Sequence, residues 1–300
     1  MSQDIKLVCG LFGLENFFPS EGIRSYINIA KEAEALGFDA VSVTDHVVMG
    51  KNLHKYPFGE FPLPSEAPWY EPLSVLNMIG SHTTSIKLAT AILITPLRNP
   101  ALLAKTAATI DVISNGRLEL GVGLGWQREE FEAAGVDFEN REEIFWETLT
   151  ILKKFWSESP TSHQGKYFQF DDIWCNPKPI QGADIPLLFG IKMNSENAKK
   201  IAAVGDGWIP IKTSRTFIED GSSLLNDAFE QAEKPLPRIR GQLPTITNEQ
   251  GYPDLDKTLE EFEKSYNAGL QEIEFFPINF IQSGEDIKPT LEKIAKLKGN

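Results

Sequence analysis

The sequence predicts a single α/β domain over residues 1–300, folded as a closed (β/α)8 TIM barrel. Short apolar runs alternate with longer segments of helical periodicity, and this pattern of strand followed by helix occurs eight times in 300 residues. No linker-like stretch divides the chain. The alternative, a doubly wound open sheet, lacks a recognisable nucleotide loop, because a G-x-G-x-x-G motif starting at Gly121 would need glycine where Trp126 stands.

Period-two or short apolar runs mark the strands, and apolar residues three or four positions apart mark the helices. The predicted strands span residues 5–12, 40–43, 86–94, 116–126, 186–190, 207–210, 239–246 and 272–278. The predicted helices span residues 23–36, 73–82, 100–114, 128–134, 142–156, 196–204, 217–232, 256–269 and 287–297. Asn99 and Asp256 are the expected caps of two of them. Two insertions, at about 47–69 and 157–185, leave the barrel rim, and the second contains a hairpin at 163–174.

The fourth strand is the most informative segment, because one of its faces is apolar and the other loses its side chains. The two faces carry Leu118, Leu120, Val122 and Leu124, and Glu119, Gly121, Gly123 and Gly125. Glycine in a strand often marks a place where a ligand or another backbone comes close. We expect the glycine face to leave space for a flat ligand, and tight packing against neighbouring elements is the alternative.

Charge and cysteine content narrow the class of partner. The formal net charge is −13, which argues against nucleic acid or an anionic membrane surface as the main partner. Two cysteines, Cys9 and Cys175, are too few for a disulfide framework. The sequence shows no apolar leader and no run of transmembrane length. We therefore expect a cytoplasmic protein that binds a small molecule.

In a parallel barrel the site lies at the carboxyl ends of the strands. Asp45 and His46 follow the second strand, and a histidine there is suited to proton transfer near neutral pH. Gly190, Ile191 and Lys192 link the fifth strand to a helix, and such a turn suits a phosphate. Metal-ligand spacings and a G-x-S-x-G elbow are both missing, so we expect neither a metal site nor that type of hydrolase.

Several further motifs occur in one order along the chain. They are ALGFDAVSVTDH at 35–46, TPLRNP at 95–100, TIDVISNGR at 109–117, LGVGLGW at 120–126, EEF at 129–131, PKP at 177–179 and GDGW at 205–208. Together they resemble the bacterial luciferase-like monooxygenase superfamily, and more narrowly its branch of coenzyme F420-dependent oxidoreductases. The resemblance implies a (β/α)8 barrel, a homodimer, and FMN or coenzyme F420 bound at the barrel mouth.

The resemblance also assigns roles. Asp45 and His46 match a catalytic pair, and Ala91 and Ile92 match a bulge with a non-prolyl cis peptide behind the cofactor ring. The cofactor-binding residues expected in this way, with Trp126 and Lys192 added as neighbours, are Ala91, Ile92, Leu124, Gly125, Trp126, Gly190, Ile191 and Lys192. Trp126 stands where related sugar-phosphate dehydrogenases have an acidic glutamate. Since indole cannot exchange a proton at neutral pH, sugar-phosphate oxidation is not expected.

The implied function is hydride transfer or monooxygenation of a small organic substrate. The aromatic loop points to an apolar substrate, and packing of the loop onto the barrel rim is the alternative; its rings are Tyr56, Phe58, Phe61, Trp69 and Tyr70. The alternatives are an FMN-dependent monooxygenase specifically, a flavin-binding barrel without catalysis, and an unrelated barrel lyase or hydrolase. The sequence has no recognisable motif with a catalytic lysine or a carboxylate pair, which argues against a lyase or hydrolase.

Overall fold

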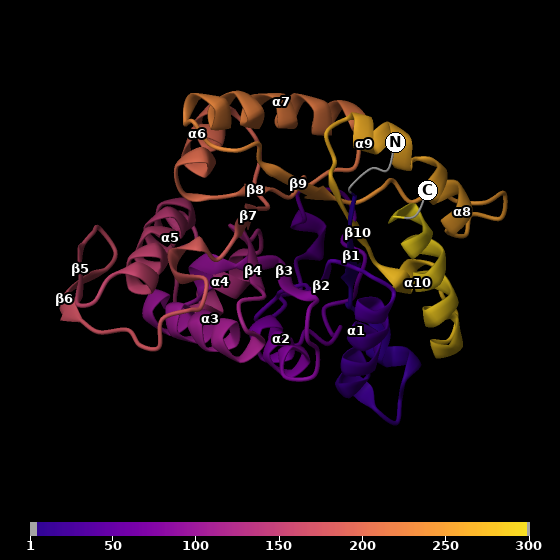
Figure 1. The fold of residues 1–300 in the computed structure, drawn as a ribbon, viewed down its shortest axis with the longest axis horizontal. Helices are drawn as coiled ribbons and strands as arrows, with labels where there is room; N and C mark the ends of the chain where they lie inside the picture. The colour runs from indigo at the N-terminus through magenta and orange to yellow at the C-terminus, as the bar shows by residue number, and fades with distance from the viewer. Residues whose placement is uncertain (1–4, 299–300) are drawn as a thin grey trace.

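The computed structural model describes residues 5–298, which form a closed barrel of eight parallel strands (Figure 1). Around the barrel the strand order is β1, β2, β3, β4, β7, β8, β9 and β10, and β10 pairs with β1. These strands are Lys6–Gly10, Ala40–Val43, Lys87–Ile94, Leu118–Gly123, Leu187–Phe189, Gly207–Trp208, Arg238–Gly241 and Glu272–Phe275. The predicted barrel is confirmed, and the doubly wound alternative is wrong.

Helices surround the barrel and cover the apolar outer faces of its strands (Figure 1). They are α1 Ser25–Ala35, α2 Pro72–Gly80, α3 Pro100–Ser114, α4 Arg128–Ala134, α5 Arg141–Ser157, α6 Ser195–Val204, α7 Arg215–Gln231, α8 Leu255–Glu260, α9 Phe262–Asn267 and α10 Ile287–Ala295. Asn99 caps α3 as expected, since its side chain accepts hydrogen bonds from the amides of Ala101 and Leu102.

The last third of the chain differs from the sequence prediction at the ends of two strands and in one helix. Strand β9 ends at Gly241, whereas the predicted strand runs to residue 246. Asp254, not Asp256, caps α8, because its carboxylate accepts the Lys257 amide at 3.1 Å and the helix begins one residue later. The single helix expected over 256–269 is two short helices, α8 and α9, which meet at Glu261. The final strand ends at Phe275, since residues 277–279 form a 3-10 turn that starts with Pro277.

The two expected insertions differ in structure. Strands β5 (Thr161–Gln164) and β6 (Gln169–Ile173) pair as an antiparallel hairpin that lies beyond α5, at the left edge of Figure 1. The 47–69 segment is irregular except for a 3-10 turn at Leu53–Lys55. Over residues 5–298, no helix is both long enough and apolar enough to cross a bilayer.

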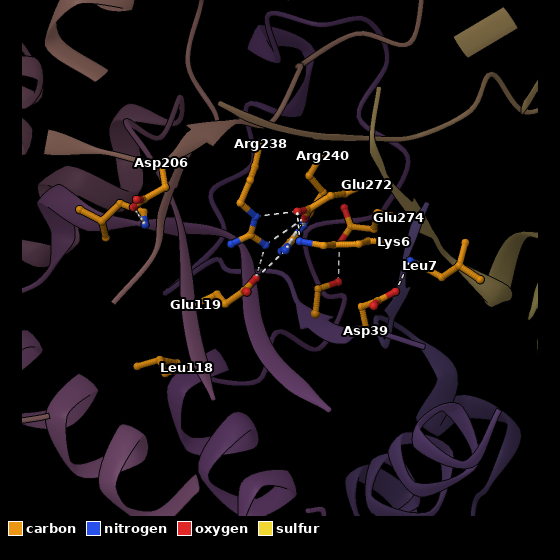
Figure 2. A network of polar contacts seen from close by, with 12 residues as sticks. Lys6, Leu7, Asp39, Leu118, Glu119, Asp206, Arg238, Arg240, Glu272 and Glu274 are labelled. Atoms are coloured by element: carbon orange, nitrogen blue, oxygen red, sulfur yellow. Dashed lines mark hydrogen bonds and ion pairs between the residues drawn. The ribbon is translucent and has the colours of Figure 1, made fainter. Parts of the chain in front are cut away.

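Charged side chains fill the amino-terminal end of the barrel interior, where aliphatic residues are usual. Arg238 and Arg240 of β9 lie between Glu119 of β4 and Glu272 of β10 (Figure 2). Arg240 donates to Glu119 at 2.6 Å and to Glu272 at 2.8 Å, and Arg238 contacts the same two carboxylates at 2.9 and 2.6 Å. The four residues are defined here as the floor network. It joins three strands of the barrel.

Burial makes the floor network costly to disrupt. Burial alone would raise the pKa of Glu119, but the charges and hydrogen bonds of Arg240 and Arg238 outweigh it and lower that pKa from 4.5 to about 2. The pKa of Glu272 is lowered in the same way, by Arg240 and Arg238 acting against burial. Removing one partner of a buried pair typically costs about 3–5 kcal/mol, because an uncompensated charge stays behind.

We expect Arg240→Met to lower the free energy of unfolding in urea by about 3–5 kcal/mol at pH 7. Because the pKa of Glu119 is lower in the folded state, ionised Glu119 contributes fully to the free energy of unfolding above about pH 4.5. This contribution is lost as the pH falls through about 2. The difference between wild type and variant should therefore narrow from pH 5 downwards. Arg215→Gln, which removes an exposed pair with Glu219, should cost under about 1 kcal/mol. A gap that is independent of pH would contradict the assignment.

Candidate active site

The carboxyl end of β3 carries an irregularity at the predicted place. The pairing of β3 with β4 shifts register between Thr90 and Leu93, and the Ala91–Ile92 peptide bond is cis. The expected non-prolyl cis peptide is thus confirmed. Ala91 and Ile92 are half-buried at the mouth of the barrel, the end at which α/β barrels bind their ligands.

The glycines of β4 do not border open space, so that expectation is wrong and tight packing is correct. A Cβ atom on Gly121 would overlap the carbonyl oxygen of Thr90, and one on Gly123 would overlap Cδ1 of Ile92. Gly125 follows the strand with a φ of +72°, and a Cβ there would lie 2.6 Å from Ile94. The side chain that occupies the bare face near the mouth is therefore that of Ile92.

Gly190, after β7, approaches the same side chain, since a Cβ there would lie 2.7 Å from Cγ2 of Ile92. The structure thus brings Ile92 and Gly190 together, and Ala91 precedes Ile92 across the cis peptide bond. Ile191 is buried, and its carbonyl accepts the indole N–H of Trp208 at 3.0 Å. Lys192 is exposed just before Asn194, whose side chain caps α6 by accepting the Asn197 amide at 2.8 Å.

The carboxylate of Asp45 is engaged on both oxygens. Arg98 donates to Oδ2 at 2.6 Å and to Oδ1 at 2.9 Å, and the amide of Ile94 donates to Oδ2 at 2.8 Å. The side chain is 1% exposed. Asp45 therefore ties the end of β2 to the end of β3. Charge-assisted, bidentate arginine pairs of this kind hold geometry well.

His46 contacts a different carboxylate. Its Nδ1 lies 3.0 Å from Oε2 of Glu130, and Oε1 of Glu130 accepts the Val47 amide at 2.7 Å. Glu130 is fully buried, on α4. Because a carboxylate only accepts hydrogen bonds, Nδ1 carries the proton in this pair and Nε2 is the nitrogen left for a ligand.

Aromatic rings enclose His46. Its ring centroid lies 4.6 Å from Trp69, 5.8 Å from Phe61 and 6.1 Å from Trp126, each in an edge-to-face arrangement. Tyr56 adds a further edge contact to Trp126 at 5.2 Å. The indole nitrogens of Trp69 and Trp126 are buried without a hydrogen-bond partner in the described chain. The surroundings of the histidine are thus apolar but contain two unpaired donors.

Hydrogen bonds hold the 47–69 segment against the turn after β4. The Gln127 side chain accepts the Gly50 amide at 2.7 Å and donates to the Gly50 carbonyl at 3.1 Å. Asn52 also donates to Glu129. The segment that supplies Tyr56, Phe61 and Trp69 is therefore fixed to the turn that carries Trp126.

Sequence reasoning missed Glu130 and Arg98 as site residues. Arg128, at the start of α4, is 47% exposed, whereas Glu130, two residues later in the same charged stretch, is fully buried. A signal was present, since Gln127, Glu130 and Phe131 have the spacing of one helix face, and all three are buried.

A closed (β/α)8 barrel with a buried histidine–carboxylate pair at the carboxyl ends of its strands defines an enzyme-like TIM barrel. The chain belongs to the luciferase-like monooxygenase family, whose sequence description matches residues 13–251. It is 32% identical over 238 residues to an uncharacterised protein of Mycobacterium tuberculosis, covering 76% of this chain and 82% of that one. An F420-dependent glucose-6-phosphate dehydrogenase of Amycolatopsis mediterranei is 24% identical, with 92% and 77% coverage.

Solved structures share the fold at low identity. A monooxygenase from Streptomyces bottropensis superposes with a TM-score of 0.77 at 19% identity, covering 97% of this chain and 98% of that one. An F420-dependent secondary alcohol dehydrogenase and an FMN-bound type II Baeyer–Villiger monooxygenase from Pseudomonas putida both have a TM-score of 0.74 at 16% identity. These two cover 98% and 99% of this chain, and this chain covers 98% of each. The family is therefore one of oxidoreductases, and its members include F420-dependent and FMN-bound enzymes.

Substitutions on the glycine face test its packing. We expect Gly123→Ala to lower the free energy of unfolding by about 1–3 kcal/mol, because the added methyl displaces Ile92. Ile92→Val removes the overlapping Cδ1 and should restore part of that loss. Gly121→Ala meets backbone instead, so it should cost more, and Ile92→Val should not relieve it.

Urea unfolding of the single and double variants gives the coupling energies directly. A coupling of at least about 0.5 kcal/mol between positions 123 and 92, with none between 121 and 92, is the expected pattern. Additive effects at 123 and 92 would mean that Ile92 does not occupy the glycine face.

Proposed function

We propose that this protein binds a flavin-type cofactor, coenzyme F420 in preference to FMN, at the barrel mouth and transfers hydride to or from a small apolar substrate. The observation that carries the proposal is the His46–Glu130 pair, held at 3.0 Å beneath a wall of aromatic rings. Family membership and the F420-dependent relatives support the choice of cofactor.

The residues at the mouth suit such a group. Ile92, with Gly190 beside it, offers a half-buried apolar surface for a planar ring, and Ala91 extends that surface. Lys192 and the amino-terminal end of α6 supply a cation and backbone N–H groups for a phosphate. Leu124, Gly125 and Trp126 lie on the turn after β4, on the same rim. Buried indole donors without partners fit a ligand that supplies hydrogen-bond acceptors.

The cofactor would supply the hydride chemistry, and the protein supplies orientation, proton transfer and exclusion of water. His46 presents Nε2 to the site because Glu130 holds Nδ1, so Nε2 is the atom that exchanges a proton with the substrate oxygen. Asp45 positions the strand ends through Arg98 and does not touch the substrate. Phe61, Trp69 and Trp126 keep the site apolar.

A second candidate is monooxygenation of an apolar substrate with reduced FMN. An aromatic wall that excludes water, together with Trp126 in place of an ionisable side chain, is equally compatible with that chemistry. Fold similarity to an FMN-bound monooxygenase supports it. The choice of cofactor separates these two candidates. A non-catalytic barrel would instead bind one of the cofactors and show no turnover.

We expect saturable quenching of cofactor fluorescence when the protein is titrated with coenzyme F420, and weaker binding of FMN. Lys192→Gln should weaken binding of FMN about tenfold without changing binding of riboflavin, which has the same ring and no phosphate. Lys199→Gln, which changes an exposed lysine within α6, is the matched control and should leave both unchanged. Dissociation constants above about 1 mM for both cofactors would end the proposal.

Glu130→Gln keeps the shape of the side chain and removes its charge. With a substrate identified from secondary alcohols and their ketones, we expect kcat to fall about 100-fold or more while KM changes little, because Glu130 orients His46 and does not touch the substrate. His46→Asn should lower kcat at least as much. Cofactor affinity should be retained in both variants.

The double variant distinguishes a positioning role from independent action. If Glu130 works through His46, adding Glu130→Gln to His46→Asn should cost little more than His46→Asn alone. Glu132→Gln, at an exposed position on α4, should leave kcat unchanged. Multiplicative losses, or a normal rate in Glu130→Gln, would show that the pair is not a catalytic unit.

A further inference from the structure

A cavity of about 300 Å³ opens at the amino-terminal end of the barrel, opposite the mouth. Its wall is formed by the first residues of the strands, including the floor network (Figure 2). The charged lining residues are Lys6, Lys87, Arg238, Arg240, Asp39, Glu119 and Glu272. Four are cationic and three are acidic, so the cavity is locally positive in a protein whose formal net charge is −13.

The acidic groups of this wall already have partners. Glu119 and Glu272 each accept hydrogen bonds from both arginines of the floor network. Asp39 accepts the Leu7 amide at 2.8 Å and pairs with Lys298 at 2.6 Å. Their demand for donors is therefore met within the chain.

Several donors are not engaged in the same way. Nη1 of Arg240 is buried and has no hydrogen-bond partner within residues 5–298, and the residue as a whole is 1% exposed. The side chain of Lys87, half-buried at the start of β3, makes no hydrogen bond or ion pair with residues 5–298, whereas its backbone amide donates to the Asp39 carbonyl at 2.9 Å. Lys6 reaches Glu272 only at 3.6 Å. A buried charged donor without a partner is costly, so such a group calls for a ligand or ordered water.

Glu274 lies next to this wall and does not supply the missing acceptor. Its carboxyl accepts the Ser42 hydroxyl on β2. Burial raises its pKa, against the opposing effects of Ser42 and Arg240, which favours the neutral form. No hydrogen bond or ion pair joins Glu274 to Arg240 within residues 5–298, so Glu274 does not occupy Nη1 of Arg240.

We propose that this cavity binds a small oxyanion, such as phosphate, sulfate or a short carboxylate, between Lys87, Lys6 and Nη1 of Arg240. Planar guanidinium groups and ammonium groups are the usual partners of such anions. The volume admits a small anion with bound water. The site lies at the other end of the barrel from His46, so it is separate from the proposed cofactor site.

The test is calorimetric titration of the full chain with sodium phosphate and, separately, sodium acetate, each at ionic strength fixed with sodium chloride. Thermal unfolding in the same buffers provides a second readout. We expect saturable binding of one or both anions and a melting temperature that rises and then levels off. Lys87→Gln should weaken binding at least about tenfold, whereas Lys87→Arg, which keeps the charge, should retain it.

Lys199→Gln, exposed on α6, is the control for loss of one surface charge and should bind like wild type. A melting temperature that rises linearly with phosphate, equally in wild type and Lys87→Gln, would be a general salt effect and would overturn the proposal. Saturation by chloride alone would overturn the assignment to oxyanions. Affinity for the cofactor should be the same in Lys87→Gln and wild type, so this proposal and the proposed function can fail separately.

Discussion

The shift in register between β3 and β4 is the constraint that determines the packing at the mouth of the barrel. Over Thr90 to Leu93 the two strands lose register, and the extra length turns Ile92 onto β4. Only glycine at positions 121 and 123 leaves room for that path, because a methyl group at either would overlap the β3 backbone or Ile92. The same side chain then meets Gly190 across β7. One irregularity in one strand thus shapes a surface to which three strands contribute.

The two ends of the barrel differ in the polarity of their side chains. At the floor, β4, β9 and β10 are joined by arginine–glutamate pairs, which satisfy the buried carboxylates but leave Nη1 of Arg240 without a partner among the described residues. At the mouth, the carboxylate of Glu130 contacts His46, and aromatic rings pack around the same imidazole. A parallel barrel concentrates chemistry at the carboxyl ends of its strands and leaves the other end to stability. The charged cavity at the floor departs from that division and carries the second site proposed above.

Sequence pattern was sufficient for the barrel and for elements with strong terminal signals. Helix α3 has its predicted bounds because Asn99 and Pro100 start it and Asn115, with a φ of 58°, ends it. The residue that packs on the glycine face of β4 could not be predicted from the sequence of that strand, because Ile92 belongs to β3. Glu130 was missed because a charged triplet on a short helix resembles solvent-exposed surface. The catalytic and cofactor-binding assignments remain predictions for the experiments above to decide.

The two hydrogen bonds between the Gln127 side chain and the backbone of Gly50 have a consequence for the evolution of ligand specificity in a protein of this kind. Strand β2 ends before this point, and residues 51–69 pair with no barrel strand in the part of the chain that the structure describes. Side-chain hydrogen bonds at Gly50 attach the segment to the turn after β4. Exchange of Tyr56, Phe61 or Trp69 would change the aromatic surroundings of His46 and Trp126 without altering strand pairing. Residues 51–69 can therefore change in sequence while the barrel keeps its structure, and new ligand preferences can evolve through substitutions in this segment.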